Sequence, residues 1–312
     1  MTTYIIRQSI YSLFIILGVL SVTFVIIRVL PGDPARLALG QRADAQSQEA
    51  LRREWKLDQP LPVQYIYYVG NALQGDLGRS FQSNRQVTEA IIERIPRTAI
   101  LSVSAIIIAS ILGTLIGIIS AWKPYTIFDN SSMIFALLGI SVPVFVLGTL
   151  FLLIFSTKLR LVDSTGYIIG RNGLQLELLI LPMLALAARP LSIFARITRS
   201  AMLDVLSQDY VRTARAKGVS EKVTVLKHAF RNALNPVVTT ISAWFAATLA
   251  GTFFIELIFN WPGMGYYAFK AVLANDYPVI QGVVIFTAVL FVLVNLIVDI
   301  LYSVIDPRVR LS

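Results

Sequence analysis

Few residues in this sequence could carry out catalysis. The chain has no cysteine, so disulfides, thiolate nucleophiles and cysteine-containing zinc or iron–sulfur sites are excluded. The only histidine is His228, so a histidine-rich catalytic metal site would have no second imidazole. A Ser-His-Asp triad would need His228, which lies in a basic stretch, and we interpret it as a surface histidine. The sequence therefore favours a protein that is not an enzyme, with no metal and no cofactor of its own.

Phosphate-binding motifs are the next chemistry to consider. No G-x-x-x-x-G-K-[ST] segment occurs, so we expect that this chain does not bind ATP through a P-loop. Gly263-x-Gly265-x-x-Ala268 has the spacing of a dinucleotide fingerprint, but it follows an apolar span and not a soluble strand. We interpret that segment as a chance match.

Arg189 is the charged residue that lies deepest in an apolar run. It stands roughly 18 Å into a helix that rises 1.5 Å per residue, and a charge at such a depth suggests a function. It could attract the carboxylate of a substrate. Alternatively, it could pair with Glu256 or Asp299, or with carbonyls freed by Pro190. For Asp299 and Asn295, hydrogen bonding between helices is the simpler interpretation.

The composition requires that lipid cover much of this chain. Of its 312 residues, 56% are hydrophobic and 14% are charged, and the mean hydropathy is +0.70. A soluble core of ordinary size could not bury so much apolar surface. We therefore predict an all-α polytopic membrane protein with about six transmembrane helices. The expected spans are Ser9–Leu30, Ala99–Trp122, Ser132–Ser156 with Pro143 inside it, Leu178–Ile197, Val237–Phe259 and Val279–Val304.

Two features of the spans leave alternatives to weigh. Ser9–Leu30 could be a signal peptide, but it exceeds the 7–15 apolar residues typical of one, so we favour an uncleaved helix. Gly113 and Gly117 form a Gly-x-x-x-Gly pattern that lets helices pack closely in lipid. We read that pattern as packing only.

Charge predicts the orientation in the membrane. Ala195–Arg231 has eight Lys/Arg and three Asp/Glu, and the positive-inside rule places it on the cytoplasmic side with both termini. The net charge of +9 is therefore better explained by basic loops than by nucleic acid. We expect residues 1–30 to form the N-terminus and first span, 31–96 an extracytoplasmic insertion, 97–304 the remaining spans with a cytoplasmic loop at 199–236, and 305–312 a cytoplasmic tail.

The cytoplasmic loop between the fourth and fifth spans has the pattern of a helix–turn–helix. Ser207 can cap a short helix, on which Tyr210, Val211 and Ala214 share one face. Gly218 suits the left-handed position that ends a helix. Ser220 can cap a second helix, which we expect to run to Leu234, with Pro236 at the entry to the next span. An ordinary basic loop bound to anionic lipid headgroups remains open as an alternative.

This loop also carries a resemblance to a known family. Tyr210–Gly218 resembles the cytoplasmic "EAA" loop of ABC-importer permeases, and more narrowly the B-type permease subunit of dipeptide, oligopeptide and nickel importers. Arg212-Thr213 and Asn235-Pro236 depart from the general pattern, as the peptide branch commonly does. The glutathione-importer permease is especially similar in Ala214–Gly218 and Pro31–Arg36. Further matches, over nearly the whole chain, are Leu30–Pro34, Leu57–Leu61, Gly75–Gly78, Phe259–Gly265, Asp276–Gln281 and Asp306–Arg308.

The resemblance implies a fold, a function and a set of partners. The fold would be that of a type I ABC-importer permease in a bacterial plasma membrane. The chain would form a pathway for peptides or related small solutes with a second, homologous permease subunit. Two ABC ATPase subunits would bind ATP and push on the loop, and an extracytoplasmic solute-binding protein would deliver the solute. The loop residues that we expect to couple to the ATPase are Asp209, Tyr210, Val211, Ala214, Arg215 and Gly218.

Three other classes of protein are weighed against this one. A secondary transporter would be expected to show an internal repeat with interrupted helices in matching halves, and no clear repeat is visible. An intramembrane enzyme would need a nucleophile and a base that converge, and none stand out. A membrane scaffold without transport activity fits the composition but has no need of the loop at Ser207–Pro236. The sequence does not choose between a dipeptide, a longer peptide, glutathione, a nickel chelate or another solute.

Overall fold

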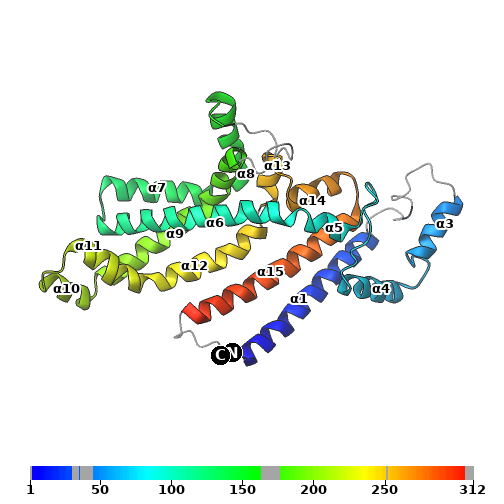
Figure 1. Ribbon diagram of the computed structural model, residues 1–312, viewed down its shortest axis with the longest axis horizontal. Helices are drawn as coiled ribbons and strands as arrows, with labels where there is room; N and C mark the ends of the chain where they lie inside the picture. The colour runs from blue at the N-terminus through cyan, green and yellow to red at the C-terminus, as the bar shows by residue number, and fades with distance from the viewer. Residues whose placement is uncertain (1, 30–34, 36–44, 163–175, 251, 306–312) are drawn as a thin grey trace. The chain divides into compact units, whose positions relative to one another are not determined.

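The computed structural model describes residues 2–29, 35, 45–162, 176–250 and 252–305 (Figure 1). Within these ranges the chain is helical, and its β pairing is a single isolated bridge between Arg79 and Gln86. The contacts divide the chain into two compact units. Unit 1 comprises residues 1–97, 263–296 and 311–312, and unit 2 comprises residues 98–262 and 297–310. Each unit is described by itself.

Unit 1 is built on two long helices and the insertion between the first two expected spans. Its elements are α1 (Thr2–Val29), α3 (Ala45–Glu54), α4 (Leu61–Leu73), α5 (Val87–Ile92), α14 (Met264–Leu273) and the greater part of α15 (Tyr277–Ile305). Hydroxyl groups join α1 to α4, because Ser21 bonds Tyr65 at 2.6 Å and Thr23 bonds Tyr68 at 2.9 Å. The apolar core of the unit comprises Val87, Ile91, Met264, Ala271, Val279 and Val283.

A buried carboxylate fixes the loop between α4 and α5. Asp276, which is 3% exposed, accepts a hydrogen bond from Ser80 Oγ at 2.5 Å. The same side chain accepts one from the Phe81 N–H at 3.0 Å. A buried carboxylate needs such donors to offset its desolvation. This interaction joins the residues just after Gly75–Gly78 to the first residue of Asp276–Gln281, which is far away in the sequence.

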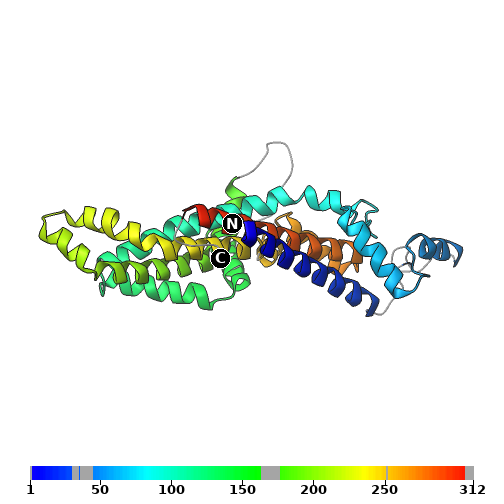
Figure 2. The same cartoon turned by 90° about the horizontal axis from the view of Figure 1, so that it is seen from below.

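Unit 2 contains the remaining helices. They are α6 (Ile95–Trp122), α7 (Ile127–Ser141), α8 (Val144–Phe151), the π-helix η1 (Leu152–Lys158), α9 (Leu176–Leu206), α10 (Asp209–Ala216), α11 (Glu221–Val223), the π-helix η2 (Thr224–Ala229), α12 (Phe230–Ala250) and α13 (Phe253–Ile258). α9 packs against α7, α8, α12 and α13, and its neighbour α12 is seen beside it in both views (Figures 1 and 2).

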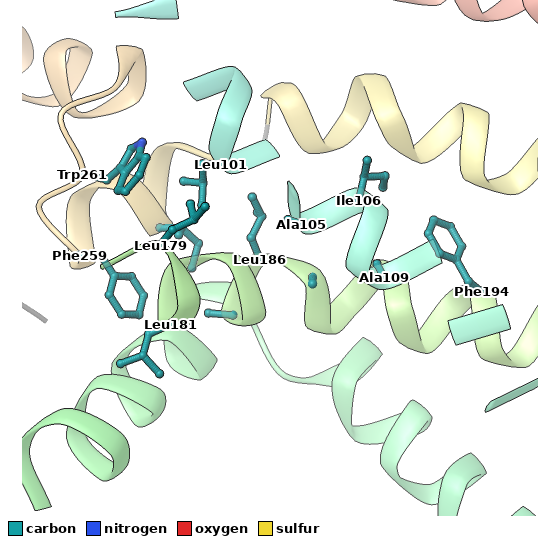
Figure 3. Close-up of a cluster of buried hydrophobic side chains, with 13 residues drawn as sticks. Leu101, Ala105, Ile106, Ala109, Leu179, Leu181, Leu186, Phe194, Phe259 and Trp261 are labelled. Carbon is teal, nitrogen blue, oxygen red and sulfur yellow. The ribbon is translucent and has the colours of Figure 1, made fainter. Parts of the chain in front are cut away.

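Two apolar clusters stabilise unit 2. The larger one joins α6, α9 and the segment after α13, and it includes Leu101, Ala105, Leu186, Phe194 and Trp261 (Figure 3). The smaller cluster joins the other end of α6 to α9, η2 and α12. Its fully or nearly fully buried members are Ile118, Ala121, Ala201, Met202, Val225, Ala229 and Ala233.

Helices cover the positions of the six expected spans, but among the described residues only some of them are long and apolar enough to be spans. Among the described residues, Val87–Trp122, Glu177–Leu206 and Tyr277–Val298 are long and apolar enough to cross a bilayer, and α7 with α8 and η1 qualifies as a bent pair. In α1 the apolar stretch is shorter and covers Ile10–Ile26. α12 has 21 residues, and polar Arg231 and Asn232 follow its first residue, Phe230. The tail at 306–312, most of the 158–173 loop and the Pro31–Pro34 motif lie outside the described residues.

The third span is not continuous, which corrects the prediction made from sequence. α7 ends at Ser141, α8 begins at Val144, and their axes differ by 109°. Pro143 lacks an amide hydrogen, and its ring disfavours the helical conformation of the preceding residue. Val142 accordingly has an extended backbone, with φ −82° and ψ 128°. The proline therefore breaks the helix inside the expected span Ser132–Ser156.

The fifth span also differs from the sequence prediction. Pro236 lies inside α12, which begins earlier, at Phe230, and ends at Ala250. A separate short helix, α13, then covers most of the remainder of the expected span Val237–Phe259. Pro236 does not end the helix here, because the residue whose carbonyl it would leave unbonded, Asn232, is exposed and can be solvated. The helix therefore continues through the expected boundary.

The close packing predicted from Gly113 and Gly117 is confirmed. A Cβ atom placed on Gly113 would lie 2.6 Å from the Leu191 carbonyl oxygen and 2.9 Å from Phe194 Cβ on α9. One placed on Gly117 would lie 2.6 Å from the Ala195 carbonyl oxygen. The two glycines therefore let the backbones of α6 and α9 meet directly.

This packing predicts the effect of a single added methyl group. Gly113→Ala should lower the free energy of unfolding by about 1–3 kcal/mol, because the new Cβ overlaps backbone that cannot move alone. Gly70→Ala in α4 is the matched control, since no atom lies within 4 Å of its Cβ position. That change should be neutral or stabilising, because alanine favours a helix. Thermal unfolding of the purified protein, followed by tryptophan fluorescence, measures both, and equal melting temperatures would contradict the packing.

Candidate functional site

The short helix α10 begins without the cap that the sequence suggested. Its N-cap residue is Gln208, and no side chain there bonds the helix. Ser207, the expected cap, donates instead to the Asp204 carbonyl oxygen at 2.8 Å, one turn back on α9. The start of α10 is consequently set one residue later than expected. Ser220, the other expected cap, does occupy the N-cap position of α11, but its side chain makes no cap hydrogen bond.

The end of α10 matches the sequence prediction. Gly218 has φ +78°, the left-handed conformation that glycine adopts without strain. Its N–H donates to the Arg215 carbonyl oxygen at 3.0 Å, and the Val219 N–H donates to the Ala214 carbonyl oxygen at 3.2 Å. These two bonds define a Schellman motif, which satisfies carbonyls that the helix end would leave open. The prediction that Gly218 is the C′ residue is therefore confirmed.

The apolar face of α10 packs against the chain's own π-helix. Val211 is fully buried, and α10 contacts η2. The Tyr210 hydroxyl accepts a hydrogen bond from Asn232 Nδ2 at 2.7 Å, and it lies 3.5 Å from the carbonyl oxygen of His228. Ala214 is half-buried on the same side. The side chain of Val211 therefore packs inside this chain, and its part in coupling to the ATPase stays a prediction.

The outward face of α10 is charged. Asp209 and Arg212 form an exposed pair at 3.3 Å, with side chains that are 92% and 79% exposed. Arg215 donates to both carboxylate oxygens of Glu221, at 3.0 and 2.7 Å, across the turn at Gly218. These hydrogen bonds lower the pKa of Glu221 and raise the pKa of Arg215, so both groups stay charged at neutral pH. The exposed face thus presents fixed charges beside a rigid turn.

α10 is connected to the long helices through η2. Val225 and Ala229 of η2 are fully buried in the smaller cluster, where they meet Met202 of α9 and Ile118 of α6. η2 contacts α10 on one side and α9 on the other. A displacement of α10 would therefore reach α9 through packed side chains, which do not compress readily.

A buried ion pair braces the same end of unit 2, and sequence reasoning missed it. Asp129, which is fully buried, accepts bidentate hydrogen bonds from Arg199 of α9 at 2.6 and 2.7 Å. Asp129 also accepts a hydrogen bond from the Tyr125 N–H at 2.8 Å. A local signal was present, because Thr126-x-x-Asp129 has capping-box spacing and the Thr126 side chain does cap α7. Arg199, the partner of Asp129 on α9, is not marked by any such local motif in the sequence.

Arg189 lies on α9 with an exposed side chain. Its guanidinium carbon is 5.7 Å from the centre of the Trp244 ring on α12, a distance compatible with a cation–π contact. The described ion pairs do not join it to Glu256, which is fully buried and accepts a hydrogen bond from Thr98 Oγ1 at 2.7 Å. The side chain of Asp299, its other expected partner, lies outside what the structure describes. Over the described ranges, no three metal-ligating side chains cluster.

Comparison with known proteins places this chain in a family. The model of the binding-protein-dependent transport system inner membrane component matches residues 113–311, and that of the N-terminal part of such membrane components matches residues 1–102. The glutathione transport system permease protein GsiC of Escherichia coli K12 is 42% identical over 310 residues, with 99% of both chains covered. Its counterpart in Salmonella typhimurium LT2 is 43% identical over the same length.

A relative from a different transport system is similarly close. The dipeptide transport system permease protein DppB of Alkalihalophilus pseudofirmus is 40% identical over 332 residues, with 99% of this chain and 100% of the relative covered. The matches cover nearly the full length of each protein, and the described helices agree with the all-helical permease fold of the family. The chain belongs to the binding-protein-dependent transport system inner membrane components, and it is a multi-pass permease subunit of an ABC importer.

Proposed function

We propose that this chain forms the translocation pathway of a bacterial importer for peptides or related small solutes, together with a second, homologous permease subunit. The observation that supports a peptide-type solute is the full-length similarity to permeases named for glutathione and dipeptide transport. Two ABC ATPase subunits would hydrolyse ATP on the cytoplasmic side, and a solute-binding protein would deliver the solute outside. The surrounding lipid is that of the inner membrane.

In this proposal α10 receives the push of the ATPase. Its charged face, with Asp209 and Arg215, would contact the ATPase groove. Tyr210, Val211 and Ala214 would hold α10 on its own chain, because their contacts are internal. Gly218 would keep the turn to the next helix fixed. The charges of α10 are exposed, and its other face packs against η2. This favours the coupling role over attachment to lipid headgroups, because attachment to lipid would not require a rigidly held helix.

Gly218→Val tests this role without introducing a steric clash. No atom lies within 4 Å of the Gly218 Cβ position, so the change acts through the left-handed backbone alone. It should cost about 1–2 kcal/mol locally and tilt the following helix. We expect uptake to be abolished and ATPase co-purification to be weakened, while the chain still inserts in the membrane. Gly218→Asn is the matched control and should retain both, because asparagine tolerates this conformation.

The lipid-anchor alternative makes the opposite prediction for the same assays. Under it, the charge reversals Lys222→Glu and Lys227→Glu would impair uptake, since they remove attraction to anionic lipid. Gly218→Val would then leave ATPase association intact. Under the coupling role, substitutions at exposed Lys222 should be mild, because a single surface charge contributes little. Retention of bound ATPase by Gly218→Val would therefore overturn the coupling proposal.

The proposed topology places both termini and the 199–236 loop in the cytoplasm and the 31–96 insertion outside. The absence of native cysteine provides a clean background for labelling. Single cysteines at Gln46 and Ser220, which are both exposed, should react with a membrane-impermeant thiol reagent from opposite sides. Gln46→Cys should be labelled in intact cells and Ser220→Cys only after the membrane is opened. Labelling of both in intact cells would contradict this topology.

Arg189 is proposed to attract the carboxylate of a peptide in the pathway. Its side chain is exposed in this chain, and its guanidinium carbon lies 5.7 Å from the centre of the Trp244 ring. Arg189→Gln should slow uptake of a peptide with a free C-terminal carboxylate about tenfold, as expected for loss of a charged hydrogen bond. Uptake of the C-terminally amidated peptide should change less. An equal loss for both peptides, at normal expression, would instead indicate a structural role.

A further inference from the structure

Unit 1 contains a cavity that the coupling and pathway roles do not use. It has a volume of about 450 Å³ and lies among the segment after α3, the helix α4, the 76–81 loop and the first turns of α15. This volume falls within the roughly 300–1,000 Å³ typical of small-molecule sites. On the proposed topology, the part formed by the insertion faces the outside of the cell.

The walls of the cavity are largely aromatic. Trp55 stacks on Phe81, with ring centres 5.3 Å apart and planes 11° apart. Tyr67, Tyr68 and Tyr277 line the cavity as well. The Tyr68 ring is held in place, because its hydroxyl bonds Thr23 of α1. Such flat rings provide contact area for an apolar or aromatic side chain of a ligand.

Charges of both signs line the same cavity. Lys56 lies with its Nζ 5.7 Å from the centre of the Tyr67 ring, and Arg79 lines the cavity from the 76–81 loop. Asp76 is the acidic group, and its Oδ1 accepts a hydrogen bond from the Gly78 N–H at 2.9 Å. A ligand with one anionic end, one cationic end and an apolar side chain would match this set.

The framework of the cavity is built from buried polar contacts. Gln64, which is 7% exposed, donates through Nε2 to the carbonyl oxygens of Gln59 at 2.7 Å and Leu57 at 3.2 Å. These bonds hold the segment that presents Trp55 and Lys56. Gln64 Oε1 has no hydrogen-bond partner among the described residues, so a buried acceptor adjoins the cavity. Buried acceptors without a partner are rare and favour the approach of a donor.

We propose that this cavity binds a short zwitterionic peptide on the permease itself. The peptide carboxylate would lie toward Lys56 and Arg79, its ammonium group toward Asp76, and an apolar side chain against Trp55 and Phe81. The inference rests on the proposed import of peptides and on the external position of the insertion. It adds a solute site on this subunit, separate from Arg189, that selects peptides by their two charged ends.

Direct binding to the complete importer tests the site. The importer is purified in lipid nanodiscs without its solute-binding protein, and binding of radiolabelled alanyl-phenylalanine is measured by equilibrium dialysis. Wild type should bind it saturably. Lys56→Gln and Arg79→Gln should each raise the Kd about tenfold, the loss expected for a charged hydrogen bond. Trp55→Leu should weaken binding as well. Arg53→Gln is the matched control, since Arg53 is exposed on α3 and does not line the cavity.

Modified peptides and an uptake assay complete the test. The N-acetylated and C-terminally amidated forms should bind more weakly than the zwitterion. Absence of saturable binding by wild type, or equal affinities of Lys56→Gln and Arg53→Gln, would overturn the site. Uptake of the same peptide by the wild-type importer with its solute-binding protein is measured in parallel. If uptake is intact while the cavity binds nothing, the proposed transport function stands and only the cavity assignment fails.

Discussion

The close contact between α6 and α9 is the constraint on which unit 2 depends. In a bilayer, helices gain little from the hydrophobic effect when they associate, so they rely on close packing and on hydrogen bonds. Gly113 and Gly117 allow the two backbones to touch, and the apolar clusters at both ends of the contact fill the remaining space. α9 also carries α7, α8, α12, α13 and η2 on its surface. A change in the position of α9 would therefore be shared by these elements.

α10 is attached to this group of helices through its contact with η2, which packs against α9. A short exposed helix is marginal by itself, because nucleation is unfavourable and eight residues make few internal bonds. Here the Schellman end, the buried Val211 and the Tyr210–Asn232 hydrogen bond stabilise it from three sides. The ion pair between Asp129 and Arg199 also joins the first turn of α7 to α9, at the end of α7 that lies away from Pro143. A buried pair of this kind is costly to break, since either partner alone would remain a desolvated charge.

The sequence predicted the features that depend on neighbours along the chain. Gly218 was identifiable because only a left-handed glycine suits the end of such a helix, and Gly113 because small residues repeat at helical spacing. The break at Pro143 could not be predicted, since whether a proline kinks or breaks a helix depends on the elements that surround it. Burial of Val211 against η2 could not be assigned, because an apolar face does not reveal which surface covers it. The contact of Asp276 with Ser80 spans 196 positions and has no local signal at all.

We propose that α10, the π-helix η2 that it contacts, and α12, which continues from η2, move as one body when the ATPases act. The absence of native cysteine permits spin labels at single engineered pairs, here Thr213→Cys on α10 and Thr239→Cys on α12, both at exposed positions. Pulsed electron–electron double resonance on the assembled importer would give the distance between the two spin labels, with and without ATP and vanadate. If these helices move together, the same narrow distance distribution is expected in both states. A distance distribution that shifts or broadens when nucleotide binds would show that α10 moves relative to α12, and would contradict this rigid coupling.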